Sequence, residues 1–119
     1  MISNFQTNLK EIKDKVTAIG DGLYKANVLL MNALETCDSE QFNAARQHLK
    51  NVSSKADDID NSIIKVLALY TPEAKDLRQV VAYMKITNEL TRASSNTRSF
   101  IRGFTDVCED VEGTMIKEY

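Results

Sequence analysis

The chain contains no tryptophan and has little proline, glycine, cysteine or histidine: one Pro, four Gly, two Cys and one His in 119 residues. With so few helix breakers among many Ala, Leu, Lys and Glu residues, the expected fold class is all-α. The longest apolar run, ANVLLMNAL, is far shorter than the roughly 20 residues that cross a bilayer, and the first residues lack the apolar region of a signal peptide. These absences predict a cytoplasmic protein without membrane insertion.

The chain also lacks a strong charge of either sign, since its net charge is −2 and its pI is about 5.4. Nonspecific binding to nucleic acid or to anionic lipid depends on a basic field, so neither is expected. The single His48 has no nucleophile at a recognisable spacing, and no Gly-rich phosphate loop is present. Cys37 and Cys108 are far apart and form no CxxC motif, so we interpret both as ordinary thiols. The sequence therefore predicts neither an enzyme nor a cofactor.

What the chain does contain is three long runs of apolar residues spaced alternately by three and four, which is the spacing of a helix with one buried face. The spacing predicts helices near residues 4–36, 39–70 and 72–112. Thr71 and Pro72 mark the last boundary, because Thr caps helices and Pro suits their first turn. Short connections between long helices predict an antiparallel up-down-up three-helix bundle, a single domain over residues 1–119.

The third run has hydroxyl groups where a bundle helix usually has apolar side chains. Thr87, Ser94 and Thr97 fall on its predicted buried face, between apolar ends. An unpaired buried hydroxyl costs about 1–3 kcal/mol. One explanation is that each hydroxyl bonds to the carbonyl group four residues earlier. The other arises from the resemblance described next.

The stretch LALYTPEAKDLRQVVAYMKITNELTRASS resembles the signature of the PhoU family of phosphate-signalling regulators, Q-P-x-A-x-D-L-R followed by a Lys-containing apolar helix and L-E-R-x-G-D. Eight positions of this chain match that pattern: Pro72, Ala74, Asp76, Leu77, Arg78, Lys85, Leu90 and Arg92. The resemblance implies one three-helix repeat of a family whose members look like two tandem repeats. It also implies regulation of phosphate transport and of phosphate-starvation signalling, with a phosphate ABC transporter and a sensor histidine kinase as partners. The alternative function is a helical scaffold or dimerisation module without a phosphate role.

The family resemblance also implies metal-binding carboxylate pairs, E-or-D-x-x-x-D, on the second and third helices. The corresponding positions here are Ala56 with Asp60 and Thr91 with Ser95, so only Asp60 is a carboxylate. We therefore expect no tightly bound multinuclear metal and interpret the polar stretch as a former ligand face. Asp57 and Asp60 are weak candidates for a single divalent ion, although consecutive acids point in different directions and favour a solvated face. Elemental analysis of protein purified without chelator tests this expectation, and stoichiometric metal after dialysis would contradict it.

Two further expectations concern contacts. Asp76 and Arg78 are expected to brace the end of the bundle by contacting another helix or loop, with partner binding as the alternative. Apolar residues outside the main buried faces predict a two-fold homodimer, because a single small bundle covers little surface. The candidate interface residues are Leu29, Met31, Ile64, Leu67, Val81 and Met84.

Overall fold

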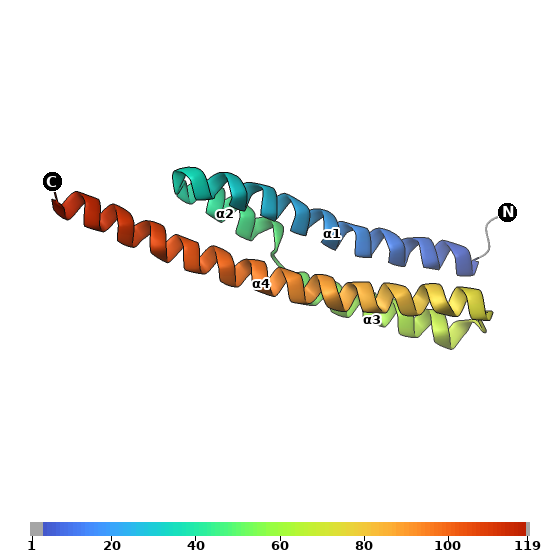
Figure 1. Cartoon of the computed structure of the whole chain (residues 1–119). Coiled ribbons are helices and arrows are strands. Elements are labelled where there is room, and N and C mark those ends of the chain that lie inside the picture. The colour runs from blue at the N-terminus through green and yellow to red at the C-terminus, as the bar shows by residue number, and fades with distance from the viewer. Residues whose placement is uncertain (1–3, 119) are drawn as a thin grey trace. The chain divides into compact units, whose positions relative to one another are not determined.

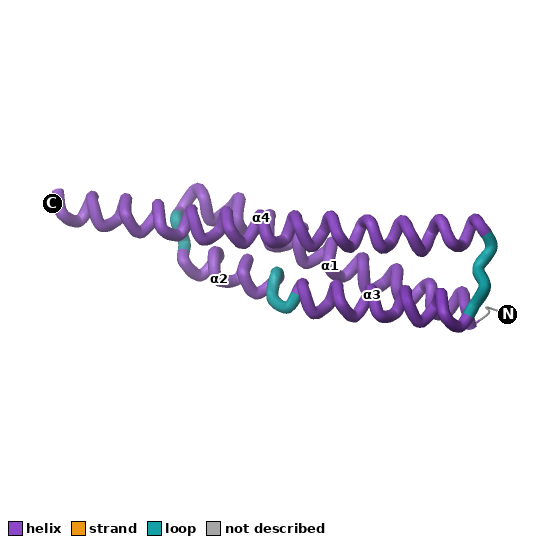
Figure 2. The backbone as a smooth tube through the Cα atoms, turned by 90° about the horizontal axis from the view of Figure 1, so that it is seen from below, coloured by secondary structure: helices purple, strands orange, loops and turns teal. Residues whose placement is uncertain are grey.

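The computed structural model describes the backbone of residues 4–118 and the side chains of residues 4–109. The described part is helical throughout, apart from short connections, and contains no strand, as expected. Its helices are α1 (Asn4–Thr36), α2 (Ser39–His48), α3 (Val52–Leu69) and α4 (Ala74–Glu118) (Figure 1). Three short connections join them (Figure 2).

The predicted helix over 39–70 is wrong as a single element, because it is broken between α2 and α3. The N–H groups of Leu49 and Lys50 donate to the carbonyl oxygens of Arg46 and Gln47, three residues earlier, at 3.1 and 3.3 Å. Asn51 then adopts φ 63°, ψ 24°, a left-handed conformation that Asn tolerates better than most residues. The buried face nevertheless continues through the break, since Leu49 and Val52 are both buried.

The other predicted boundaries agree to within two residues, except at the end of the last helix. The first helix has the predicted bounds, Asn4–Thr36. Helix α4 begins at Ala74, two residues after the predicted start, and Glu73 supplies the carbonyl that accepts the N–H of Leu77 at 2.9 Å. It extends to Glu118 rather than ending near residue 112, because Gly113 weakens a helix by only about 1 kcal/mol and does not stop it.

The contacts divide the chain into two compact units. Unit 1 comprises residues 1–21 and 51–92, and unit 2 comprises residues 22–50 and 93–119. Each unit therefore contains a part of α1, a part of α4 and one of the two short helices. The prediction of a single domain over 1–119 remains a prediction.

Unit 1 has a core of large aliphatic side chains from α1, α3 and α4. Its nine buried members are Leu9, Ile12, Val16, Ile19, Val52, Ile59, Ile63, Val66 and Val80. At one end of the unit, the Phe5 ring meets Tyr70 edge-on at 5.5 Å. Farther along α1, Lys15 Nζ lies 2.8 Å from Asp58 Oδ2 and 3.1 Å from Ser62 Oγ. Residue numbers on α3 thus fall as those on α1 rise.

Unit 2 has a core with smaller side chains, drawn from α1, α2 and α4. Its buried members are Ala26, Leu30, Ala33, Phe42, Ala45, Leu49, Ile101 and Cys108. Asp38 caps α2 by accepting the N–H of Glu40 at 2.9 Å. Helices α1 and α2 approach closely at Gly22, where an added Cβ would lie 2.8 Å from the carbonyl oxygen of His48. The close approach explains a glycine that the sequence shows only as a weak point in a helix.

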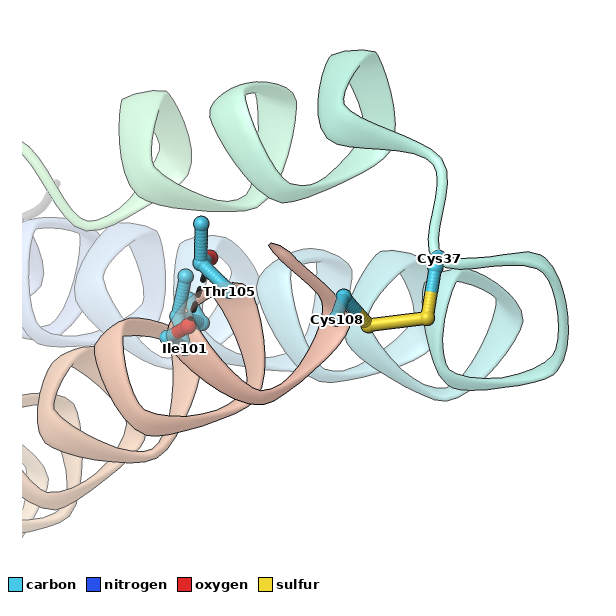
Figure 3. Close-up of a disulfide and its surroundings, with 4 residues drawn as sticks. All are labelled: Cys37, Ile101, Thr105 and Cys108. Carbon is cyan, nitrogen blue, oxygen red and sulfur yellow. Dashed lines mark hydrogen bonds between the residues drawn. A yellow bond between two sulfur atoms is a disulfide. The ribbon is translucent and has the colours of Figure 1, made fainter. Parts of the chain in front are cut away.

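The expectation that Cys37 and Cys108 are ordinary thiols is wrong, because the two sulfurs form a disulfide within unit 2 (Figure 3). Cys37 follows the last residue of α1, and Cys108 lies on α4, with their Cα atoms 5.6 Å apart. The two residues are 71 positions apart in the sequence. Only the packing of α4 against the α1–α2 turn brings them together, and no local motif records that packing.

Candidate partner-binding surface

The hydroxyls of α4 occupy buried positions as the periodicity predicts. Thr87 and Ser94 are fully buried, and Thr97 is half-buried. Thr87 Oγ1 donates to the carbonyl oxygen of Tyr83 at 2.7 Å, and Thr91 Oγ1 donates to that of Thr87 at 2.8 Å. The bond to the carbonyl four residues earlier is therefore confirmed for Thr87, and it offsets the cost of burying that hydroxyl.

The four positions that match the family's ligand pairs do not provide a metal-binding set. Ala56 is buried and has no donor atom, and Asp60 is half-buried on the same helix. The hydroxyl of Thr91 is committed to α4 itself, and Ser95 Oγ is exposed and accepts from Arg98 Nη2 at 3.4 Å. Hard metal ions require several oxygen ligands, preferably charged. These residues do not fit a multinuclear cluster.

The acidic run on α3 lies on the solvent side of the helix. Asp57 and Asp58 are exposed, and Asp58 pairs with Lys15 at 2.8 Å. Among the described residues, no three His, Cys, Asp or Glu side chains gather as they would around a metal ion. His48, the only histidine, is exposed at the end of α2.

The first turns of α4 have two faces of different character. The inner face carries Val80, which is fully buried, with Tyr83 and Met84 packed against the core of unit 1. The outer face carries Leu77 and Val81, which are 42% and 36% exposed. Exposed aliphatic side chains four residues apart form a stripe along one side of a helix, so this face offers apolar surface to the solvent.

The outer stripe belongs to a shallow groove of about 360 Å³, which we call the signature groove. Its lining residues are Leu77, Arg78, Val81, Ala82 and Lys85. Both cations are exposed, and neither forms an ion pair or a side-chain hydrogen bond with the residues described here. An apolar floor flanked by available positive charges fits an amphipathic helix with acidic residues.

The matched signature residues fall into three sets. Leu77, Arg78 and Lys85 line the signature groove. Leu90 packs against the core of unit 1, and Pro72 is half-buried in the connection before α4. The bracing role expected for Arg78 stays a prediction, and no polar contact among the described residues supports it.

The remaining signature residues take local roles. Asp76 is half-buried and lines a second groove, of about 430 Å³, together with Lys10 and Lys13 of α1. Arg92 pairs with Glu89, one turn earlier on α4. Ala74 is the exposed first residue of α4.

The candidate interface residues lie in both units. Four are exposed: Met31 (64%), Ile64 (62%), Leu67 (38%) and Val81 (36%). Leu29 and Met84 are half-buried and pack against the cores of units 2 and 1, respectively. Sequence reasoning did not select Phe100 and Val107, which are 56% and 55% exposed and line a groove of about 550 Å³ on α4 of unit 2.

Comparison with known proteins identifies a family. A family model, the PhoU domain, matches residues 16–101. Two curated relatives, from Pseudomonas aeruginosa and Pseudomonas putida, are each named "Phosphate-specific transport system accessory protein PhoU homolog". Each is 25% identical to this chain over 108 residues, which are 91% of the chain but 45% and 42% of the relatives. The chain thus spans less than half the length of these relatives. No solved structure matches it.

Proposed function

Because the chain belongs to the PhoU domain family, we propose that it regulates phosphate transport and phosphate-starvation signalling through helical contacts with partner proteins. The observation that carries this proposal is the signature groove. Three residues matched to the family signature, Leu77, Arg78 and Lys85, line a groove that packing within unit 1 does not require. Side chains without an internal structural role are available for a partner.

The proposed partners are a phosphate ABC transporter and a sensor histidine kinase, and the proposed location is the cytoplasm. The relatives' names connect them with the transport system. Among the described residues, no helix is long and apolar enough to cross a membrane. An accessory role by contact needs no catalytic group, so we propose that the chain is not an enzyme. A scaffold or dimerisation module without a phosphate role is the alternative.

We also propose the up-down-up arrangement for the helices. Contacts in unit 1 support it, since Asn8 Nδ2 donates to the hydroxyl of Tyr70 at 3.2 Å while Lys15, farther along α1, pairs with Asp58. In the same unit Gly20 lies beside Leu90 of α4, where an added Cβ would be 3.8 Å from the Leu90 Cδ1 atom.

A two-fold homodimer through Leu29, Met31, Ile64, Leu67, Val81 and Met84 is part of the proposal. Four of these six side chains are exposed, as an interface requires. Sedimentation equilibrium at micromolar concentration is expected to give twice the 13.4 kDa mass of the chain. Ile64→Asp, which places a charge on exposed apolar surface without disturbing a core, is expected to give the monomer mass. A wild-type mass of one chain at every concentration would contradict the dimer.

The phosphate role is tested in the protein's own host with a phosphate-starvation reporter. Deletion of the coding region is expected to raise reporter expression in phosphate-replete medium, and the wild-type chain is expected to restore repression. Arg78→Glu/Lys85→Glu is expected to fail, because it reverses both charges of the signature groove. Exposed charge changes alter stability by less than about 0.5 kcal/mol, so the failure would reflect lost binding rather than unfolding.

The matched control is Lys55→Glu/Lys65→Glu. It reverses two exposed cations on α3 of the same unit and should repress like wild type. An unchanged reporter after deletion would favour the scaffold alternative. Equal failure of both variants would mean that total charge matters rather than the groove.

A further inference from the structure

The Cys37–Cys108 disulfide joins a strained turn to α4. Cys37 has φ 55°, a left-handed conformation that is unfavourable for residues other than Gly and Asn, and its N–H donates to the carbonyl oxygen of Ala33 at 2.7 Å. It is followed at once by Asp38, the cap of α2. Figure 3 shows the sulfur bridge between Cys37 at this turn and Cys108 on α4, with Ile101 and Thr105 farther along α4. The bond therefore connects all the helical segments of unit 2 near one point.

The small side chains in the core of unit 2 make the disulfide important for the stability of this unit. Three of the eight members of its core cluster are alanines and a fourth is Cys108 itself, whereas the nine members of the unit 1 cluster are all Leu, Ile or Val, with Ala56 buried outside that cluster. Hydrophobic stabilisation grows with the buried area, so small side chains contribute less. A disulfide stabilises more as the loop that it closes lengthens, and this one spans 71 residues. We therefore expect the disulfide to supply a larger share of the folding stability of unit 2 than it would beside a core of larger side chains.

Among the described side chains, one other polar contact joins α4 to α2. Arg46 Nη2 donates to Thr105 Oγ1 at 3.1 Å, but the contact is exposed to water. Thr105 Oγ1 in turn donates to the carbonyl oxygen of Ile101 within α4 itself, at 2.7 Å. Exposed hydrogen bonds contribute little net stability, because water competes for both groups.

We propose that the Cys37–Cys108 disulfide is a reversible redox modification site that a dithiol reductant opens. The open form releases the segment of α4 around Cys108 from the α1–α2 turn, while unit 1 stays folded. This inference rests on the proposed cytoplasmic location, because disulfides in that reducing compartment are characteristically transient and redox-sensing rather than permanent. The redox site is separate from the phosphate role, since it rests on residues of unit 2 and the signature groove lies in unit 1.

The exchange begins at Cys37. This residue is half-buried at a turn, whereas Cys108 is only 7% exposed, so an incoming thiolate reaches the Cys37 sulfur first. The attack forms a mixed disulfide with Cys37 and breaks the S–S bond, and Cys108 leaves as a thiolate that takes up a proton. The second thiol of the reductant then loses its proton and attacks the reductant sulfur that is bonded to Cys37. This attack closes a disulfide within the reductant and releases Cys37 as a thiolate, which takes up a proton. Two electrons pass from the reductant, which becomes a disulfide, to the cystine.

Hydrogen exchange of the oxidised and the dithiothreitol-reduced protein tests the proposal. Reduction is expected to accelerate exchange of the amides of residues 101–108 by at least about tenfold. Once the disulfide is broken, this segment of α4 can open locally without being held at Cys108. Amides of residues 59–66 in unit 1 are expected to be unchanged. After the dithiothreitol is removed, oxidised glutathione is expected to re-form the disulfide and to restore protection.

Cys37→Ala provides the matched variant, because it removes the bond but keeps the buried Cys108 side chain and leaves a non-glycine residue at the strained position. Its unit 2 amides should exchange as in reduced wild type and should not respond to reductant. Equal exchange of residues 101–108 in both redox states of the wild type would overturn the proposal. So would equal loosening of residues 59–66, or failure of the disulfide to re-form.

Discussion

Replacing Phe42 with Ala is expected to lower the free energy of unfolding of unit 2 by about 3–5 kcal/mol. The ring is 1% exposed and is the largest fully buried side chain of the described chain. Its neighbours in the core include Ala26, Ala33 and Ala45, which cannot rearrange to fill the space of a missing ring. When the surroundings cannot collapse into the cavity, the stability falls by the lost packing contacts as well as by the lost transfer free energy of the ring.

Urea unfolding followed by circular dichroism measures this loss, and hydrogen exchange assigns it to unit 2. Phe100→Ala is the matched control, since the same truncation is made at a ring that is 56% exposed, with its centroid 4.7 Å from that of Phe104. The control is expected to change stability by less than about 1 kcal/mol. Equal losses in the two variants would show that Phe42 does not lie in the core described here.

Replacing Gly22 with Ala is expected to destabilise unit 2 by about 1–2 kcal/mol, although Ala is the better helix former. The new Cβ would lie 2.8 Å from the carbonyl oxygen of His48, a backbone atom that cannot move aside alone. Relieving the overlap would push α1 and α2 apart, and this cost exceeds the gain of about 1 kcal/mol in helix propensity.

Gly103→Ala is the matched control, because its added Cβ meets nothing within 4 Å. There the helix propensity acts alone, and thermal unfolding should show stabilisation by about 0.5–1 kcal/mol. The two substitutions are thus expected to shift the melting temperature in opposite directions. A stabilising Gly22→Ala would contradict the close approach of α1 and α2.

The residue pattern predicted the helices well where one buried face decides the structure. The three-four spacing from Phe5 to Ala33 predicted the first helix, because members of this series lie buried or half-buried along one face. The same spacing concealed the break at Asn51, since the buried face continues in phase across it. The disulfide and the role of Gly22 depend on contacts between distant segments, which single-sequence periodicity does not encode.

The candidate surface was only half visible in the sequence. The family signature singled out Leu77, Arg78 and Lys85, and surface reasoning separately singled out Val81. A helix repeats every 3.6 residues, so all four lie on one side of α4, opposite Val80 and Thr87. A helical-wheel projection of the sequence would have placed these four residues on one face. Whether Arg78 contacts another helix depends on tertiary packing, which the sequence alone does not give, so the bracing role expected for it stays a prediction.

Binding of this chain to the purified phosphate ABC transporter of its own host tests the central claim most directly. The wild-type chain is expected to bind saturably, and Arg78→Glu/Lys85→Glu is expected to weaken binding by at least about tenfold, because two favourable charge contacts become repulsive. Lys55→Glu/Lys65→Glu should bind like wild type. Equal binding by all three proteins, or no binding by the wild type, would contradict a phosphate-transport regulator that acts through the signature groove.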